Sequence, residues 1–122
     1  MKEIKHISEP NPLACGQAVI AMLTGADVNK IIRLAGTDRE TTLKDMKSLL
    51  SHFGYNCASG RKEAKKISDL PEIALLSLET PKCWHWSLFA YGRVYDPEYG
   101  VLDDFPESYR KYFWDIKKSD TK

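Results

Sequence analysis

The chain has 122 residues, of which 43% are hydrophobic and 29% are charged, and its formal net charge is +1. This size and balance predict one soluble globular domain over residues 1–122, without an overall charge that attracts nucleic acid or an anionic membrane. No apolar run approaches the ~18 residues that cross a bilayer, and the first ten residues lack the apolar core of a secretory signal. We therefore expect a cytoplasmic protein that binds neither nucleic acid nor membrane.

The first predicted helix covers residues 14–24. Residues 1–12 are expected to be extended, because Pro10 and Pro12 exclude regular helix. The segment that follows is apolar on nearly every side, which is typical of a buried helix, and Gly25 can end it.

Two further helices are predicted before residue 54. Asp27 can cap a short second helix, and Thr42 with Asp45 resembles a capping pair for a third, which Gly54 stops. Their apolar positions recur at helical spacing: Val28, Ile31, Ile32 and Ala35 in the second, and Leu43, Met46, Leu49, Leu50 and Phe53 in the third.

The second half of the chain changes to the period of β-strands. Residues 60–71 are expected to be a connection that can contain a helical turn, and Gly92 marks a hairpin turn. The order of helices first and strands second predicts an α+β fold with an antiparallel sheet. The expected strands are 55–59, 72–79, 84–91, 93–97 and 112–117.

Cys15 lies where the extended segment becomes the first helix. A thiol at a helix N-terminus meets the positive end of the helix dipole, which favours the reactive thiolate. The backbone N–H of Cys15 is free at that position and can point at a developing oxyanion. Gly16 leaves room for a substrate backbone close to the sulfur.

His85 is the candidate partner of this thiol. His6 lies in the N-terminal extension and His52 in the third helix, whereas His85 lies within a strand. If Tyr91 and Gly92 form a two-residue turn, Ala90 faces Arg93 and Ser87 faces Asp96. Asp96 then shares a sheet face with His85 at a diagonal position, within side-chain reach.

These three residue types in this order suit nucleophilic catalysis. The Asp96 carboxylate can accept the Nδ1–H of His85, which leaves Nε2 to face the thiol of Cys15. Each residue alone also has an ordinary structural explanation as a packed cysteine, a strand histidine or a turn aspartate. Cys57 is expected to be a packed strand residue, and Cys83 has no assigned role.

The cysteine count and spacing indicate reduced thiols. Three cysteines without a CxxC motif do not form a disulfide framework, and no Cys/His spacing resembles a zinc site. We therefore expect no metal and no organic cofactor. Aromatic residues near the hairpin either belong to the core, which is the favoured interpretation for Trp84 and Trp86, or line a peptide groove: Trp84, Trp86, Tyr91 and Tyr95.

The chain resembles the papain-like superfamily of cysteine peptidases, and among them the compact double-glycine leader peptidase domains and their free-standing bacterial and phage relatives. The segments that carry the resemblance are "CGQAVIAMLTG", "GTDRETTLKDMKSLLSHFGY" and "HWSLFAYGRVYDP". The resemblance implies a central helix packed on an antiparallel sheet. It also implies Cys15 as nucleophile, His85 as general base and then acid, and Asp96 as the residue that orients the imidazole.

Glu9 departs from the pattern of that superfamily. A glutamine about six residues before the cysteine normally donates its amide N–H to the oxyanion, and here Glu9 stands at that position. A carboxylate cannot donate unless it is protonated. Asn11 and Gln17 are the alternative amide donors nearby.

The leading interpretation is a cysteine hydrolase that cleaves a peptide or isopeptide bond of a peptide or protein substrate through an acyl-enzyme. The same triad can also deamidate glutamine or transfer an acyl group. A third interpretation, which Glu9 favours, is a papain-like domain that binds a peptide or partner without turnover. The sequence does not indicate the oligomeric state.

Overall fold

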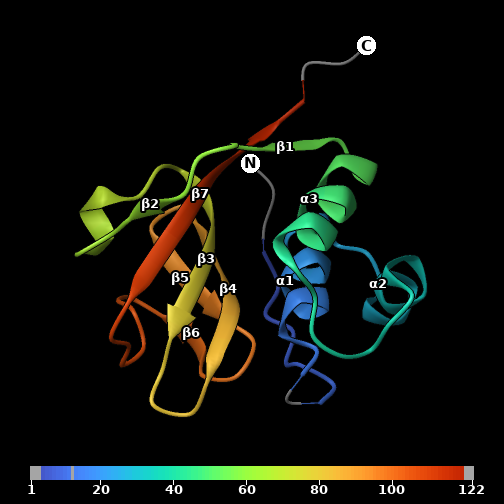
Figure 1. Ribbon diagram of the computed structural model, residues 1–122, viewed down its shortest axis with the longest axis horizontal. Coiled ribbons are helices and arrows are strands. Elements are labelled where there is room, and N and C mark those ends of the chain that lie inside the picture. Colours follow the sequence, from blue (N-terminus) through green and yellow to red (C-terminus); the bar gives the residue numbers. More distant parts are fainter. Residues whose placement is uncertain (1–3, 12, 120–122) are drawn as a thin grey trace.

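The structure is a computed structural model that describes residues 4–11 and 13–119. Within these residues, three α-helices pack on one face of a seven-stranded antiparallel sheet (Figure 1). This arrangement confirms the α+β expectation. None of the helices in the described residues has the length and apolar character needed to span a bilayer.

The helical layer follows the capping signals of the sequence. Asp27 accepts a hydrogen bond from the backbone N–H of Asn29, and Thr42 with Asp45 forms a reciprocal capping box. Gly25 ends the first helix in the left-handed conformation, at φ 80°. The helices are α1 (Cys15–Thr24), α2 (Val28–Ala35) and α3 (Leu43–His52).

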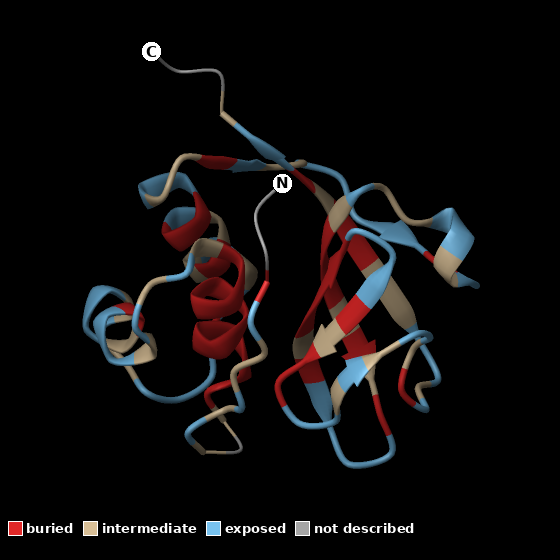
Figure 2. Cartoon of the chain, turned by 180° about the vertical axis from the view of Figure 1, so that it is seen from behind, coloured by how far each residue is buried: buried red, intermediate tan, exposed pale blue. Residues whose placement is uncertain are grey.

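Helix α1 is the centre of the helical layer. Every residue of α1 from Cys15 to Leu23 is buried, and in Figure 2 the helix is almost entirely in the buried colour. It contacts α2 and α3 on one side and strands of the sheet on the other. Complete burial explains why its sequence is apolar all round rather than amphipathic.

The sheet has the order β1-β7-β3-β4-β5-β6, and the short strand β2 pairs with β7. The sequence did not predict β2 and β6, which have two and three residues. A 3₁₀-helix at Ile67–Asp69 accounts for the expected helical turn between residues 60 and 71. The strands are β1 (Tyr55–Cys57), β2 (Lys62–Glu63), β3 (Ile73–Glu79), β4 (Trp84–Ala90), β5 (Arg93–Asp96), β6 (Gly100–Leu102) and β7 (Lys111–Lys118).

The β4–β5 hairpin has the predicted register. Ala90 pairs with Arg93, and the turn residues Tyr91 and Gly92 both have positive φ angles, 51° and 88°. Two consecutive positive φ angles define the type I′ turn that matches strand twist. Continuing the pairing places Ser87 opposite Asp96 at the end of the hairpin.

The two faces of β4 belong to different clusters. Leu88 and Ala90 belong to the core between sheet and helices, whereas Phe89 belongs to a second apolar cluster on the other face. Strand alternation therefore places His85 and Ser87 on the face directed away from the helices.

The N-terminal segment from residue 4 to 11 is fixed to the end of this hairpin. The backbone N–H of Glu9 donates to the carbonyl oxygen of Pro97 at 3.1 Å, and His6 Nε2 lies 2.8 Å from the carbonyl oxygen of Asp96. These contacts bring Glu9 to the end of the sheet where β5 stops.

Candidate active site

Cys15 meets the sheet at an open stretch of strand edge. Strand β5 ends at Asp96, so the first residues of β4 have no partner on that side. The backbone N–H of Trp86 instead donates to Sγ of Cys15 at 3.3 Å. Because Cys15 is the first residue of α1, this bond joins the first turn of the helix to the start of β4.

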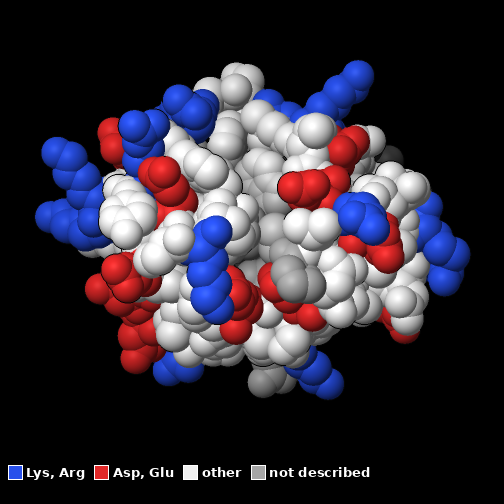
Figure 3. All heavy atoms as spheres, turned by 60° about the horizontal axis from the view of Figure 1, so that its bottom comes forward, with Lys and Arg blue, Asp and Glu red and all other residues white. Residues whose placement is uncertain are grey.

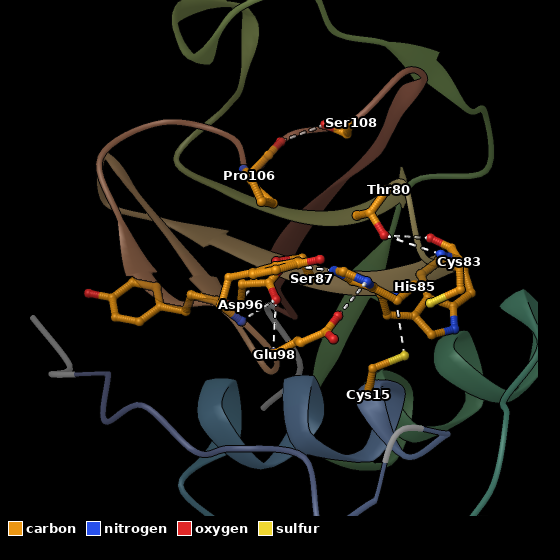
Figure 4. Close-up of polar contacts among 12 residues, drawn as sticks. Cys15, Thr80, Cys83, His85, Ser87, Asp96, Glu98, Pro106 and Ser108 are labelled. Atoms are coloured by element: carbon orange, nitrogen blue, oxygen red, sulfur yellow. Dashed lines mark hydrogen bonds and ion pairs between the residues drawn. The ribbon is translucent and has the colours of Figure 1, made fainter.

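His85 and Asp96 form a buried pair. Nε2 of His85 lies 2.8 Å from Oδ2 of Asp96, and the two side chains are 3% and 0% exposed (Figure 4). The shared face and the diagonal contact are as the sequence predicted. The ring nitrogen was predicted wrongly, because Nε2 and not Nδ1 meets the carboxylate.

The orientation of the ring leaves Nδ1 of His85 as the free nitrogen. Nδ1 has no hydrogen-bond partner among the described residues, and Oε1 of Glu98 lies 3.9 Å from it. When the neutral ring carries its proton on Nε2 and donates it to Asp96, Nδ1 keeps a lone pair that can accept a proton.

The carboxylate of Asp96 is held from both sides. Its Oδ1 accepts hydrogen bonds from the backbone N–H groups of Glu98 and Tyr99, at 2.9 and 3.0 Å. Burial opposes the charged form, but the hydrogen bond and charge of His85 together with these N–H groups lower the pKa of Asp96. Asp96 therefore remains a carboxylate that acceptor bonds fix in one orientation.

Burial also opposes the charged form of His85. The hydrogen bond and charge of Asp96 outweigh the effect of burial, and the carboxylates of Glu98 and Glu9 act in the same direction as Asp96. The pKa of His85 is therefore raised. The site is thus electrostatically suited to holding an imidazolium.

Cys15 differs from the expectation of a thiolate at rest. Burial, with a smaller contribution from the charge of Glu9 and against the N–H of Trp86, raises the pKa of its thiol to about 11. Loss of solvent is the largest cause of the shift, because Cys15 is only 8% exposed. In the free protein at neutral pH, Cys15 is a neutral thiol.

Cys15 and His85 line one cavity although they come from different layers. Cys15 approaches from the helical side, and strand alternation puts His85 on the opposite face of β4. Both residues line the cavity beside the part of β4 that β5 does not cover. The cavity has a volume of about 230 Å³. Its lining residues are Cys15, Glu40, Thr41, Ser77, Trp84, His85 and Trp86.

Glu9 belongs to the same electrostatic cluster. Its pKa is raised by burial and by the charges of Glu98 and Asp96, while His85 opposes the shift. These charge effects put Glu9 near the candidate catalytic residues, and its role at the oxyanion position stays a prediction. A raised pKa extends the pH range in which Glu9 carries a proton that it can donate.

The two alternative amide donors do not serve the site. The side-chain amide of Asn11 donates to the carbonyl oxygen of Asp38, and that of Gln17 donates to the carbonyl oxygens of Thr37 and Arg39. Both side chains fasten the segment that follows α2 to the start of α1.

Gly16 leaves room for this segment and not for a substrate. A Cβ atom on Gly16 would lie 2.1 Å from Oγ1 of Thr41, 2.9 Å from Sδ of Met46 and 3.1 Å from Cδ1 of Trp86. The indole N–H of Trp86 donates to the carbonyl oxygen of Thr41 at 3.0 Å. Glu40 and Thr41, at the end of the segment 37–41, therefore form part of the cavity wall in a fixed position.

The aromatic residues divide between site and core. Trp84 is 48% exposed and lines the cavity, so the core position favoured for it was wrong. Trp86 lines the cavity and also packs on the core. Tyr95 packs on the core, and Tyr91 lies at the far end of the hairpin, in the wall of another cavity.

The sequence reasoning missed Glu98 and Glu40. Glu98 follows the candidate Asp96 by two residues, in a turn that the aspartate itself caps, which is a detectable signal. No local pattern distinguishes Glu40 from other surface acids.

Cys83 is exposed and lies close enough for its charge to affect Cys15, whereas Cys57 is half-buried in β1. Among the described residues, no group of three or more His, Cys, Asp or Glu side chains could hold a metal ion.

Comparisons with known proteins show a likeness of fold. No model of a protein family matches the sequence, and no curated protein matches it. Among solved structures, a double glycine motif protease from an AMS/PCAT transporter, crystallised in complex with the leader peptide, has a TM-score of 0.70. The match covers 96% of this chain and 93% of that chain at 13% sequence identity. The likeness shows that this chain has the fold of that papain-like peptidase domain, in agreement with the fold implied by the sequence.

Proposed function

We propose that this protein is a cysteine peptidase in which Cys15 is the nucleophile, His85 the general base and acid, and Asp96 the orienting residue. The observation that carries the proposal is the buried His85–Asp96 hydrogen bond of 2.8 Å, with His85 in the same small cavity as Cys15. The peptide-bound protease of similar fold supports a peptide or protein substrate.

The mechanism starts from a neutral thiol. As Cys15 attacks the substrate carbonyl, its proton passes to Nδ1 of His85, and the carbon–sulfur bond forms. The imidazolium then protonates the leaving amine, the carbon–nitrogen bond breaks, and an acyl-enzyme remains. Water attacks the acyl-enzyme with its proton passing to His85, and the carboxylic acid and the thiol are released.

Asp96 stabilises the imidazolium that forms in both steps. Its carboxylate is already oriented by two backbone N–H groups, so little reorganisation accompanies the appearance of the charge. The oxyanion meets the backbone N–H of Cys15 and, when Glu9 is protonated, the hydroxyl of Glu9.

The same residues also suit two other reactions, which an experiment must distinguish from hydrolysis. Attack on a glutamine side chain gives deamidation, and an amine in place of water gives acyl transfer. A third possibility is a peptide-binding domain without turnover, which the neutral thiol of Cys15 and the carboxylate of Glu9 favour.

The test is a peptide library incubated with the protein in water enriched in oxygen-18 and read by mass spectrometry. Hydrolysis creates new C-termini that carry the heavy oxygen. Deamidation places it in a side chain without cutting the backbone, and acyl transfer leaves it out of the product. We expect heavy oxygen at new C-termini.

The matched variants are Cys15→Ala, His85→Ala and Asp96→Asn, with Cys57→Ala as a control that removes a thiol outside the site. Loss of either member of the thiol–imidazole pair lowers the rate by about 100-fold or more, because general base catalysis contributes at least that much. Asp96→Asn lowers it less. Full activity in Cys15→Ala would disprove the proposal.

A further inference from the structure

The cavity beside Cys15 has the size and walls of a side-chain subsite. Its volume of about 230 Å³ accommodates one long side chain, and Cys15 and His85 are among its lining residues. The rest of the lining combines two indoles and one acidic residue with two hydroxyl residues: Trp84, Trp86, Glu40, Thr41 and Ser77. His85 Nδ1, buried and without a hydrogen-bond partner among the described residues, lies on the same ring that lines the cavity.

Trp84 presents an aromatic surface that is unusually open for its size. It is 48% exposed, and its indole stacks nearly parallel to the ring of Tyr112, with centroids 6.0 Å apart and planes at 7°. Tyr112 also holds the guanidinium of Arg61, 3.9 Å from the ring centroid. The aromatic stack beside the cavity therefore already binds one cation.

The charges around the thiol are mainly negative. Glu40 lines the cavity, and Glu9, Asp96 and Glu98 surround His85. Figure 3 shows Asp and Glu side chains on both sides of the hollow between the sheet and the helices at this end of the molecule. The charge of Lys82 lowers the pKa of Glu9, but the side chain of Lys82 is 69% exposed and is paired with Glu98 at 3.3 Å.

We propose that this cavity binds a lysine or arginine side chain of the substrate next to the bond that Cys15 attacks, with Trp84 against its face and Glu40 as its counter-ion. An indole attracts a cation through its π-system, and a carboxylate at the cavity wall supplies the charge that a desolvated cation needs. The inference rests on the proposed function, because it specifies the substrate of the same site.

A bound cation also favours the chemistry at Cys15. The negative charge of Glu9 is one of the causes that raise the pKa of the thiol, after burial. A positive charge in the cavity opposes that effect, so a basic substrate favours the thiolate that forms during attack. The site is then most reactive when such a substrate is bound.

Charged thiol reagents test the subsite without requiring turnover. In a Cys83→Ser background, the protein is treated with the trimethylammonioethyl or the sulfonatoethyl methanethiosulfonate, and adducts at Cys15 and Cys57 are quantified by mass spectrometry. The thiolate attacks the reagent to form a mixed disulfide and releases methanesulfinate. We expect the ratio of cationic to anionic rates to be about tenfold higher at Cys15 than at Cys57.

The variants assign this preference to the subsite. Glu40→Gln lowers the ratio at Cys15 by about two- to fivefold, which is the effect of one partly screened charge pair. Trp84→Leu lowers it by a similar factor, and Trp84→Phe restores it because a π-face returns. Glu72→Gln removes the same charge at the opposite end of β3 and leaves the ratio unchanged.

Peptide substrates separate this inference from the proposed function. Paired peptides carry lysine or its uncharged analogue norleucine beside the cleaved bond, and lysine is expected to be preferred in the wild type but not in Glu40→Gln. Cleavage that ignores the charge, or a rate ratio unaffected by both Glu40→Gln and Trp84→Leu, overturns the inference. A ratio that behaves as expected without Cys15-dependent cleavage of any peptide supports the cation site and rejects the peptidase.

Discussion

The charges of His85 and Asp96 make the stability of the protein depend on pH in a defined window. The folded pKa of Asp96 lies below its ordinary 3.8, so its contribution exists above that pH and disappears as pH falls through the lowered value. The folded pKa of His85 lies above its ordinary 6.5, so its contribution exists below 6.5 and disappears as pH rises through the raised value. The pair therefore stabilises the fold most between about pH 4 and 6.5.

Asp96→Asn should reveal this window. The variant keeps a hydrogen-bonding side chain but loses the charge, so we expect the free energy of unfolding to fall by about 1–3 kcal/mol near pH 5. The difference from the wild type should shrink at pH 9, where less of the imidazole is charged than at pH 5. Urea unfolding at both pH values measures it. The control is Asp103→Asn, an 89% exposed residue in a surface pair, and an equal effect of both substitutions would refute the account.

In the proposed mechanism, Glu9 is expected to limit hydrolysis. We expect Glu9→Gln to raise kcat/KM near neutral pH by roughly 10- to 100-fold, because a neutral amide donates to the oxyanion at every pH. The raised pKa of Glu9 means that the wild type regains a protonated donor as pH falls, so the advantage of the variant should shrink toward pH 5. The measurement is the ratio of kcat/KM, variant over wild type, from pH 5 to 8. A ratio below one throughout would show that the carboxylate has a role of its own.

For single residues, the sequence predicted which face of the sheet a side chain lies on, but not how the side chain is oriented or how far it is buried. Alternation along β4 and a two-residue turn were enough to bring His85 and Asp96 to one face. The choice of ring nitrogen depends on χ angles that packing determines, and the expected thiolate required a solvent exposure that Cys15 lacks. Neither is encoded in a local pattern.

The segment of residues 37–41 supplies part of the cavity wall through Glu40 and Thr41. It has no regular structure, and its position is set by hydrogen bonds from Gln17, Asn11 and Trp86, which lie in three other segments. The sequence offers only a connection between two capped helices here. Its contacts are long-range, so no periodicity could have predicted a cavity wall.

Gly16→Ala tests the close packing of α1 against this segment. Alanine is the better helix former by about 1 kcal/mol, so helix propensity alone predicts stabilisation. The added Cβ would instead collide with Thr41 and Met46, and we expect the free energy of unfolding to fall by about 1–3 kcal/mol. Urea unfolding measures the change. Gly60→Ala, where nothing lies within 4 Å of the added Cβ, is the matched control and should be neutral. A stabilised Gly16→Ala protein would contradict the packing described here.

The longer elements were predictable because each carries its own end signals. The Thr42–Asp45 capping box and the Tyr91–Gly92 turn appear where the sequence placed them. Strands β2 and β6 were not predicted because two or three residues are too few to show an alternating pattern. They are strands because they pair with the edges of β7 and β5. Tertiary pairing, not local preference, makes them strands.

At the scale of the whole molecule, the candidate site lies at the junction of the two layers. Cys15 comes from the helical layer and His85 and Asp96 from the sheet, while the N-terminal segment brings Glu9 to the same end. The class of fold followed from the order of elements in the sequence. The meeting of Cys15 with Trp86, which are 71 residues apart, could be expected only through the resemblance to papain-like peptidases.

In the proposed mechanism Cys15 and His85 act as a pair, and the rate at which iodoacetamide alkylates Cys15 measures whether they do. The rate is measured from pH 5 to 10 in the wild type and in His85→Ala, with Cys57 as an internal reference that His85 should not affect. Because burial raises the pKa of Cys15 to about 11, both proteins should react slowly at pH 6. Between pH 7 and 8 the wild type should react at least about tenfold faster, because the imidazole accepts the thiol proton. Superimposable profiles at Cys15 would contradict the account.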